Sequence, residues 1–208
     1  ALTGVSGGVL KVVETTNLVS DGFCAGCNIT DDGENNILLG CCVGRSITTG
    51  DKNIVLGKNS VSCATVTGSD NVVLGAGSLK CVTSGSCNIA IGGRALQCNL
   101  TTGLHNIAIG QFAGQKLQNN CNIAIGHYAL QGGSGGIGNC NIAIGRHAGK
   151  KLVNGHSNIF MGTNAGKNIT GSGSADGSYN IGFGNDSLGA GASADTSGNF
   201  NAVMGHYS

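Results

Sequence analysis

The sequence predicts an all-β fold, a parallel β-solenoid of about ten stacked coils, and three observations support this. Glycine supplies 39 of the 208 residues and aromatic residues only 4%, so large side chains cannot build a thick core. A five-residue string that begins with asparagine and ends with glycine recurs along most of the chain. Its spacing matches the length of one solenoid coil, so stacked copies can pair strand on strand.

Ten copies of this string are present, typified by Asn106-Ile-Ala-Ile-Gly110, and successive asparagines are 16 to 22 residues apart. Each copy is short, β-branched and bounded by glycine, which favours a strand, and a turn and a looser second strand follow it. In such a stack the asparagines form a ladder, with side-chain amides bonded between coils. The predicted ladder consists of Asn36, Asn53, Asn71, Asn88, Asn106, Asn122, Asn141, Asn158, Asn180 and Asn201.

Side chains alternate along a strand, so the first and third residues after each asparagine share one face. We expect the large residues at these positions, such as Ile89 and Ile91, to fill the coil interior. The residue between them then points outward, and it is apolar or glycine in every copy. Such a row predicts a homo-oligomer of cyclic symmetry along the rod axis, although an enclosed strand in a monomer also satisfies the pattern. The predicted subunit interface contains Ala90, Ala108, Ala124 and Ala143.

The pattern Asn-Ile-Ala-Ile-Gly-x-x-Ala resembles the head repeats of trimeric autotransporter adhesins (YadA-like). It is also similar to the glycine- and asparagine-rich repeats of phage and viral tail fibres. The resemblance covers residues 36–205 and implies a left-handed solenoid, a homotrimer and contact with a cell surface. The step of 16 to 22 residues is longer than the adhesin repeat and closer to the fibre repeats.

The repeat divides the chain into two parts. Residues 1–35 lack it and are interpreted as an N-terminal cap or adaptor, because repeat arrays need capped ends. Residues 36–208 form the predicted solenoid domain. Polar, glycine-rich insertions at 171–178 and 189–198 interrupt the last repeats, and such insertions become surface loops. We expect these loops to contact a receptor, either a cell-surface glycan or a protein.

Composition argues against several other classes of protein. The formal net charge is +1, so the chain lacks the overall basic character of a nucleic-acid-binding protein. The longest nearly apolar run, 37–44, is too short to span a bilayer, which takes about 20 residues. We therefore expect no nucleic-acid partner and no membrane insertion. The resemblance implies an extracellular or virion-surface location.

The ten cysteines leave several hypotheses open. Cys24-x-x-Cys27 and the adjacent Cys41 and Cys42 would form disulfides, bind zinc or remain free thiols. Three more cysteines directly precede a repeat asparagine and share the face assigned to the interior, which predicts small buried hydrophobes. These are Cys87, Cys121 and Cys140.

His127 and His147 follow closing glycines at nearly equivalent places, so we expect both on an outer corner. The chain has no His-x-His pair of the kind that holds metal on the axis of some fibres, and no metal or cofactor is expected.

These features predict a non-enzymatic rod, a segment of a phage or viral tail fibre that serves in attachment to a host surface. A bacterial surface adhesin and a self-assembling extracellular filament are the alternatives. The enzyme alternative is a hexapeptide-repeat acyltransferase, which is also a trimeric β-solenoid, often with a histidine base. The steps of 16 to 22 residues do not keep to multiples of six.

Overall fold

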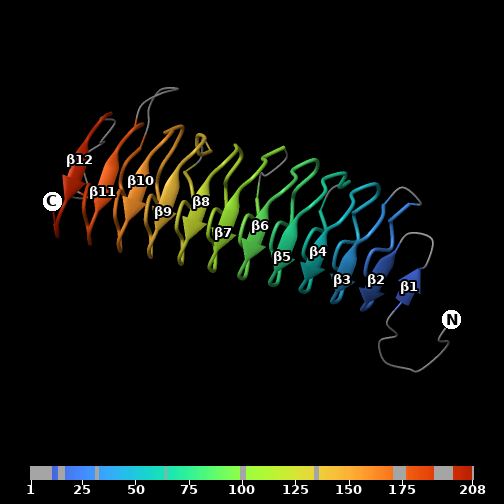
Figure 1. Ribbon diagram of the computed structural model, residues 1–208. Coiled ribbons are helices and arrows are strands. Elements are labelled where there is room, and N and C mark those ends of the chain that lie inside the picture. Colours follow the sequence, from blue (N-terminus) through green and yellow to red (C-terminus); the bar gives the residue numbers. More distant parts are fainter. Residues whose placement is uncertain are drawn as a thin grey trace.

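The computed structural model describes residues 11–13, 17–30, 33–63, 65–98, 102–133, 136–170, 177–189 and 199–207. The described chain is all-β and contains no helix; it forms a parallel β-solenoid of about nine turns. The coils stack into one elongated rod, with β1 at one end and β12 at the other (Figure 1).

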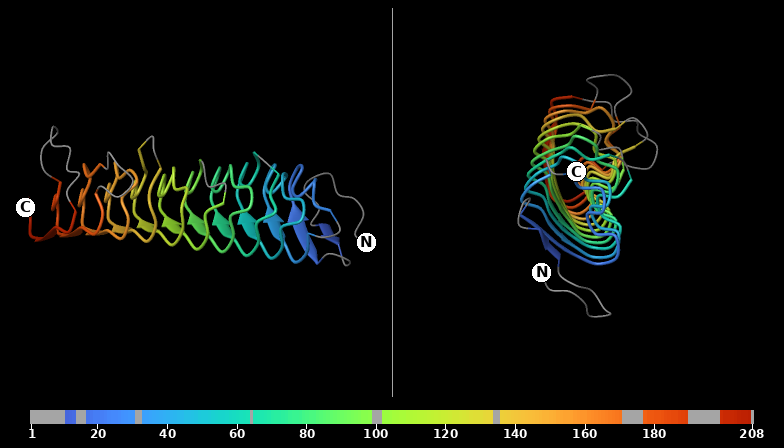
Figure 2. Two further views of the ribbon diagram at one scale, coloured as in Figure 1. Left: turned by 90° about the horizontal axis from the view of Figure 1, so that it is seen from above. Right: turned by 90° about the vertical axis from the view of Figure 1, so that its right-hand side faces the viewer.

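Each coil contributes one short strand to a single sheet that runs along the rod (Figure 2). The strands are β1 (Lys11–Val13), β2 (Leu18–Asp21), β3 (Ile37–Leu39), β4 (Ile54–Leu56), β5 (Val72–Leu74), β6 (Ile89–Ile91), β7 (Ile107–Ile109), β8 (Ile123–Ile125), β9 (Ile142–Ile144), β10 (Ile159–Met161), β11 (Ile181–Phe183) and β12 (Ala202–Met204). They lie in chain order, and from β2 onward each pairs in parallel with the next. Equivalent repeat positions therefore stack directly on one another.

The solenoid begins one coil earlier than the repeat predicts. Strand β2 pairs in parallel with β3, with Val19 opposite Ile37, and Leu18 stands where later coils have asparagine. Strand β1 pairs antiparallel with β2 and covers that edge of the sheet. Of the predicted 1–35 segment, the described residues from 17 onward thus belong to the solenoid, and β1 is the part that caps it.

Over the part of the chain that the structure describes, the wall opposite the sheet is built from turns, and the looser second strand predicted there does not form. One isolated bridge, Ile47 with Val66, is present on that wall in the described residues. Backbone hydrogen bonds nevertheless join neighbouring coils, such as Leu96 N–H to the carbonyl of Ala113 at 3.0 Å. The turns therefore satisfy their backbone groups by the same stacking that satisfies the sheet.

Glycine is required at two positions in most coils, for different reasons. The closing glycine of every repeat has a φ between +117° and +142°, a conformation open essentially to glycine alone. A second glycine, which we call the leading glycine, lies three residues before the asparagine. At Gly85 it has no positive φ, but a Cβ there would lie 2.8 Å from the carbonyl oxygen of Gly103 in the next coil. The first glycine permits the turn out of the strand, and the second permits close approach of two coils.

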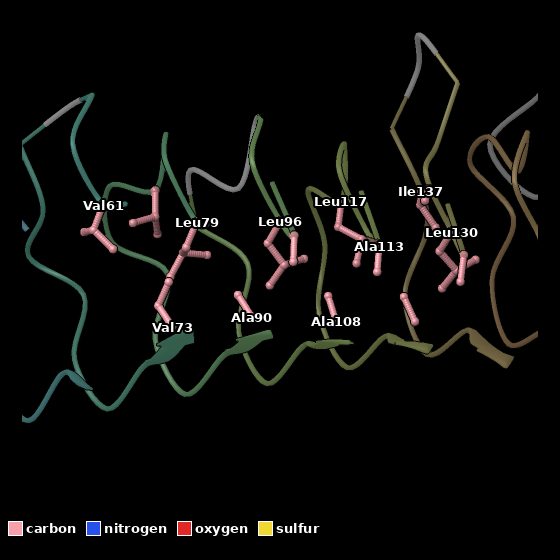
Figure 3. Close-up of a cluster of buried hydrophobic side chains, with 14 of the residues drawn as sticks. Val61, Val73, Leu79, Ala90, Leu96, Ala108, Ala113, Leu117, Leu130 and Ile137 are labelled. Atoms are coloured by element: carbon pink, nitrogen blue, oxygen red, sulfur yellow. The ribbon is translucent and has the colours of Figure 1, made fainter. Parts of the chain in front are cut away.

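Small side chains from the sheet meet large ones from the turns in the interior. Ala90 and Ala108 point inward from their strands, and Leu96 and Leu117 point toward them from the turn wall (Figure 3). Where the sheet instead supplies Phe160, the turns supply glycine. A Cβ at Gly166 would lie 2.5 Å from the ring of Phe160. A large side chain from the sheet is thus matched by a small residue in the turns, and the reverse, so the core stays closely packed.

Candidate functional surfaces

The ladder of ten asparagines that the repeat predicts is present along the rod. In the first nine, each Oδ1 accepts two hydrogen bonds from the next asparagine, one from its backbone N–H at 2.8–3.1 Å and one from its Nδ2 at 2.8–3.2 Å. Several amides also donate to a leading glycine, as Asn53 Nδ2 does to the Gly68 carbonyl at 3.0 Å. Nine of the ten are buried, and Asn201 in the last coil is exposed. Amides that are buried and fully engaged in this way hold the coils together.

The predicted subunit interface is wrong. The four alanines assigned to it are fully buried in the chain's own interior at 0% exposure, so no second subunit can touch them: Ala90, Ala108, Ala124 and Ala143. The isoleucines predicted to be interior, such as Ile89 and Ile91, are only half-buried on the opposite face. The physical reason is that the asparagine must be inside to form its ladder, and strand alternation then places the middle residue inside with it.

The sheet presents an unbroken apolar surface to the outside, which we call the outer face. It consists of the first and third residues of the ten repeat strands: Ile37, Leu39, Ile54, Leu56, Val72, Leu74, Ile89, Ile91, Ile107, Ile109, Ile123, Ile125, Ile142, Ile144, Ile159, Met161, Ile181, Phe183, Ala202 and Met204. All are apolar, and none is fully buried. Exposures of Ile37 at 37%, Ile54 at 38% and Ile181 at 36% show how much of each side chain remains uncovered. The apolar stripe inferred from the sequence therefore exists, but other residues carry it.

The four cysteines near the start of the chain divide into two pairs. Cys24 and Cys27 form a disulfide within one turn. Cys41 and Cys42 are free thiols whose sulfur atoms lie 3.5 Å apart. The hydrogen bond with Cys41, together with desolvation, raises the pKa of Cys42. No group of three or more potential metal ligands forms among the described residues, and the four sulfurs do not converge on one zinc site.

The cysteines before the asparagines are exposed rather than buried, contrary to the sequence prediction: Cys87, Cys121 and Cys140. They share the face of the isoleucines as expected, but that face is the outside. A second column of cysteines, Cys63, Cys81 and Cys98, runs along the turn wall. Burial and then the hydrogen bond with Cys63 raise the pKa of Cys81 to about 11. This thiol is therefore protonated at neutral pH and is a poor nucleophile.

An outer corner, two residues after each closing glycine, carries stacked rings. Phe112 and Tyr128 stack with centroids 4.9 Å apart and planes 2° apart. His127 and His147 lie beside them, 6.0 Å from each other, which confirms their predicted place at this corner. Arg94 lies 5.5 Å from the centre of the Phe112 ring. The corner position of the two histidines could be predicted from the sequence, but the gathering of rings and cations at one corner could not.

The insertions predicted to contact a receptor, 171–178 and 189–198, lie almost entirely outside the described residues. No helix in the described part of the chain is long and apolar enough to cross a membrane. The chain matches no protein family, no curated protein and no solved structure in comparisons with each.

Proposed function

We propose that this chain is the shaft of a homotrimeric fibre, a segment of a phage or viral tail fibre that serves in attachment to a host surface. The observation that carries the proposal is the outer face, whose two apolar rows extend over ten consecutive strands. A parallel sheet of this kind is normally covered on both faces. Three copies around an axis parallel to the rod would cover three identical outer faces at once.

The apolar area is large enough to drive such an assembly. Full burial of an isoleucine or leucine contributes about 1.5–3 kcal/mol, and up to roughly one third of that remains to be gained by most outer-face residues. Twenty such residues then give a gross gain of up to roughly 10–20 kcal/mol per chain, against an association cost of about 4–15 kcal/mol. The ten repeat strands also give each contact a length of about 43 Å, from nine spacings of about 4.8 Å.

The assembly is tested by placing one charge on each side of the sheet. Ile123→Asp puts a carboxylate on the outer face, where three copies would meet near the axis without water or partner. We expect this variant to stay folded and to become monomeric by analytical ultracentrifugation. Ala124→Asp, its neighbour, puts the same charge in the chain's own core, and we expect unfolding instead. An Ile123→Asp protein with the mass of the wild type, or a monomeric wild type, would overturn the assembly.

The biological role is tested separately by immunogold electron microscopy of the native source with an antibody against this chain. Gold along the tail or spikes of a virion would support the fibre. Gold on a cell wall or on free filaments would replace it with the adhesin or filament alternative. Label confined to the cytoplasm would overturn all three roles.

A further inference from the structure

The near-zero net charge hides a strong separation of charge along the chain. From residue 71 to residue 175 the sequence contains no aspartate or glutamate, yet it contains seven lysines and arginines. All ten acidic residues lie before or after this stretch. The middle coils are therefore basic, and the acidic residues that balance them belong to the two ends.

The cations also share one position on the coil. Nine of the 11 lysines and arginines lie one to six residues after a closing glycine, on the turn that leaves the sheet: Arg45, Lys58, Lys80, Arg94, Lys116, Arg146, Lys150, Lys151 and Lys167. We call these residues the cationic strip. Each is exposed or half-buried, and no described carboxylate forms an ion pair with any of them. Asp51 and Asp70 lie instead on the corner that precedes the sheet.

A hollow of about 200 Å³ opens within the strip, lined by Lys58, Asn59, Ala76, Gly77, Lys80, Arg94 and Gln97. It exists because Gly77 has no side chain at a corner position where its neighbours along the rod are Asn59 and Arg94. A Cβ at Gly77 would meet nothing closer than 3.8 Å, so packing does not require glycine there. Three cations and two side-chain amides around one small hollow are suited to a carboxylate or a sulfate.

Further along the strip the ring faces are already occupied. Phe112 and Tyr128 stack on each other, Arg94 lies over Phe112, and the Lys150 amine lies 4.7 Å from the centre of the Tyr128 ring. Single-stranded nucleic acids bind by stacking bases on free aromatic faces. Here the rings position cations instead of offering such faces, which favours recognition of charge over recognition of bases.

The density of charge argues in the same direction. The strip spans eight coils, or about 34 Å at about 4.8 Å per coil. Nine cations over that length give roughly one per 4 Å, whereas duplex DNA carries one phosphate charge per about 1.7 Å. Beside the cations runs a short glutamine ladder, with Gln115 Nε2 bonded to Gln97 Oε1 at 3.0 Å. Cations at this spacing, with amides beside them, match a polyanion of hydroxyl-bearing units whose charges lie farther apart than those of duplex DNA.

We propose that the cationic strip binds an acidic polysaccharide lengthwise, and that the hollow at Gly77 holds one of its carboxylate or sulfate groups. The inference rests on the proposed attachment function for its biological meaning, because it names the class of surface that the rod would attach to. The binding itself needs only the strip, which lies apart from the outer face proposed as the contact between subunits.

The test measures binding of the native assembly to polygalacturonate, chondroitin sulfate and neutral dextran by biolayer interferometry. We expect both polyanions to bind, dextran not to bind, and affinity to fall between about 50 mM and about 200 mM salt as counterions are released. The two polyanions separate carboxylate from sulfate as the preferred group. Since exposed ion contacts are each worth a few-fold in affinity, the triple variant Lys58→Gln, Lys80→Gln, Arg94→Gln should bind about tenfold more weakly.

Three further variants make the test specific to the site. Gly77→Asn fills the hollow and keeps the backbone, since asparagine already takes the left-handed conformation at Asn59 with φ 57°; it should weaken binding without changing the melting temperature. Lys58→Gln alone removes one charge from the strip and should weaken binding. Lys52→Gln removes one charge from the other corner and should leave binding unchanged.

Four results would overturn the proposal: no binding of either polyanion, no loss in the triple variant, equal losses in Lys52→Gln and Lys58→Gln, or duplex DNA bound more tightly than polygalacturonate at the same salt. Measuring the mass of the same sample separates the two proposals. A monomer that binds polygalacturonate would overturn the trimer alone, and a trimer that binds no polyanion would overturn the strip alone.

Discussion

Two adjacent glycines, Gly92 and Gly93, allow the packing of the coils to be tested by adding one methyl group at either position. Gly92 closes its repeat with φ 122°, and a Cβ there would lie 2.7 Å from both the carbonyl carbon and oxygen of Gly110. These atoms belong to the backbone of the next coil and cannot move aside as a flexible side chain would. Gly93 follows it without a positive φ, and its Cβ would meet only Gln111 Cγ at 4.0 Å. Gly92→Ala and Gly93→Ala therefore add the same atoms in opposite environments.

The expected cost of Gly92→Ala has two parts. A non-glycine residue in this backbone region costs about 1–3 kcal/mol, and the clash additionally separates two coils that are joined at 2.7 Å by the hydrogen bond from Gly110 N–H to the Ile91 carbonyl. We expect a loss of about 3 kcal/mol or more, while Gly93→Ala is neutral or stabilising by about 0.4–1 kcal/mol through its effect on the unfolded chain.

Because repeat arrays need not unfold in two states, the denaturation midpoint is best combined with hydrogen–deuterium exchange. Faster exchange in Gly92→Ala should be centred on the coils that contain residues 92 and 110. The reasoning fails if both alanine variants have the same midpoint and the same exchange pattern.

Two further predictions concern the ladder and the outer corner. Asn122→Asp removes the Nδ2 donor that bonds Asn106 Oδ1 at 3.2 Å, so it should destabilise the rod at neutral pH and recover on acidification, when the protonated carboxyl can donate again. Denaturation at two pH values measures this, with the exposed Asn120→Asp as control, since Asn120 uses Oδ1 only as an acceptor for Leu104 N–H. Burial and then Lys150 lower the pKa of His147; Arg146 and Lys167 add to this effect, and a hydrogen bond with Asn164 opposes it. Its NMR titration midpoint should therefore lie below 6.5, and stability should fall as the pH drops from 6.5 toward that midpoint, because the unfolded chain binds the proton more readily there. Bound polygalacturonate should raise the midpoint, and an unchanged midpoint in saturating polyanion would place the ligand away from this corner.

The strands and the asparagine ladder could be predicted from sequence because they depend only on a one-dimensional repeat. Asn106-Ile-Ala-Ile-Gly110 recurs with so little change that its copies must stack in register, whatever the intervening turns do. The first coil was missed because its string carries Leu18 in place of asparagine, although β2 pairs with β3 as any later strand does. A degenerate copy at the end of an array gives no periodic signal of its own.

The inner and outer faces of the strands were predicted the wrong way round because the size of the side chains was given more weight than their polarity. Placing Ile89 and Ile91 inside follows the usual preference for large apolar cores, but it leaves Asn88 on the outside with Ala90. The amide ladder requires the reverse, since a buried amide column is stable only when every member is bonded. The sequence contained this signal: one asparagine in every copy and a strict alternation are together sufficient to assign the inside.

The cationic strip could not be predicted because turn residues change their spacing from coil to coil. Lys58 follows its closing glycine by one residue and Lys80 follows its own by five, yet both line the same hollow. Only the geometry of the turn brings these offsets together. The averaged charge of +1 conceals the strip further, because the acidic residues that cancel it lie in other coils or, like Asp51 and Asp70, on the corner that precedes the sheet.

The two surfaces inferred here do not compete for the same side of the rod. Apolar side chains occupy the outer face of the sheet, whereas cations occupy the turns that leave it. An assembly that closes around the outer face therefore presents its strips outward, three to a rod in a trimer. Weak ion contacts that are worth little singly then act together, because a long polyanion bound by one strip is held near the others at high effective concentration. Repetition stabilises the rod, and the same repetition would make a weakly charged rod an effective ligand for a repetitive surface.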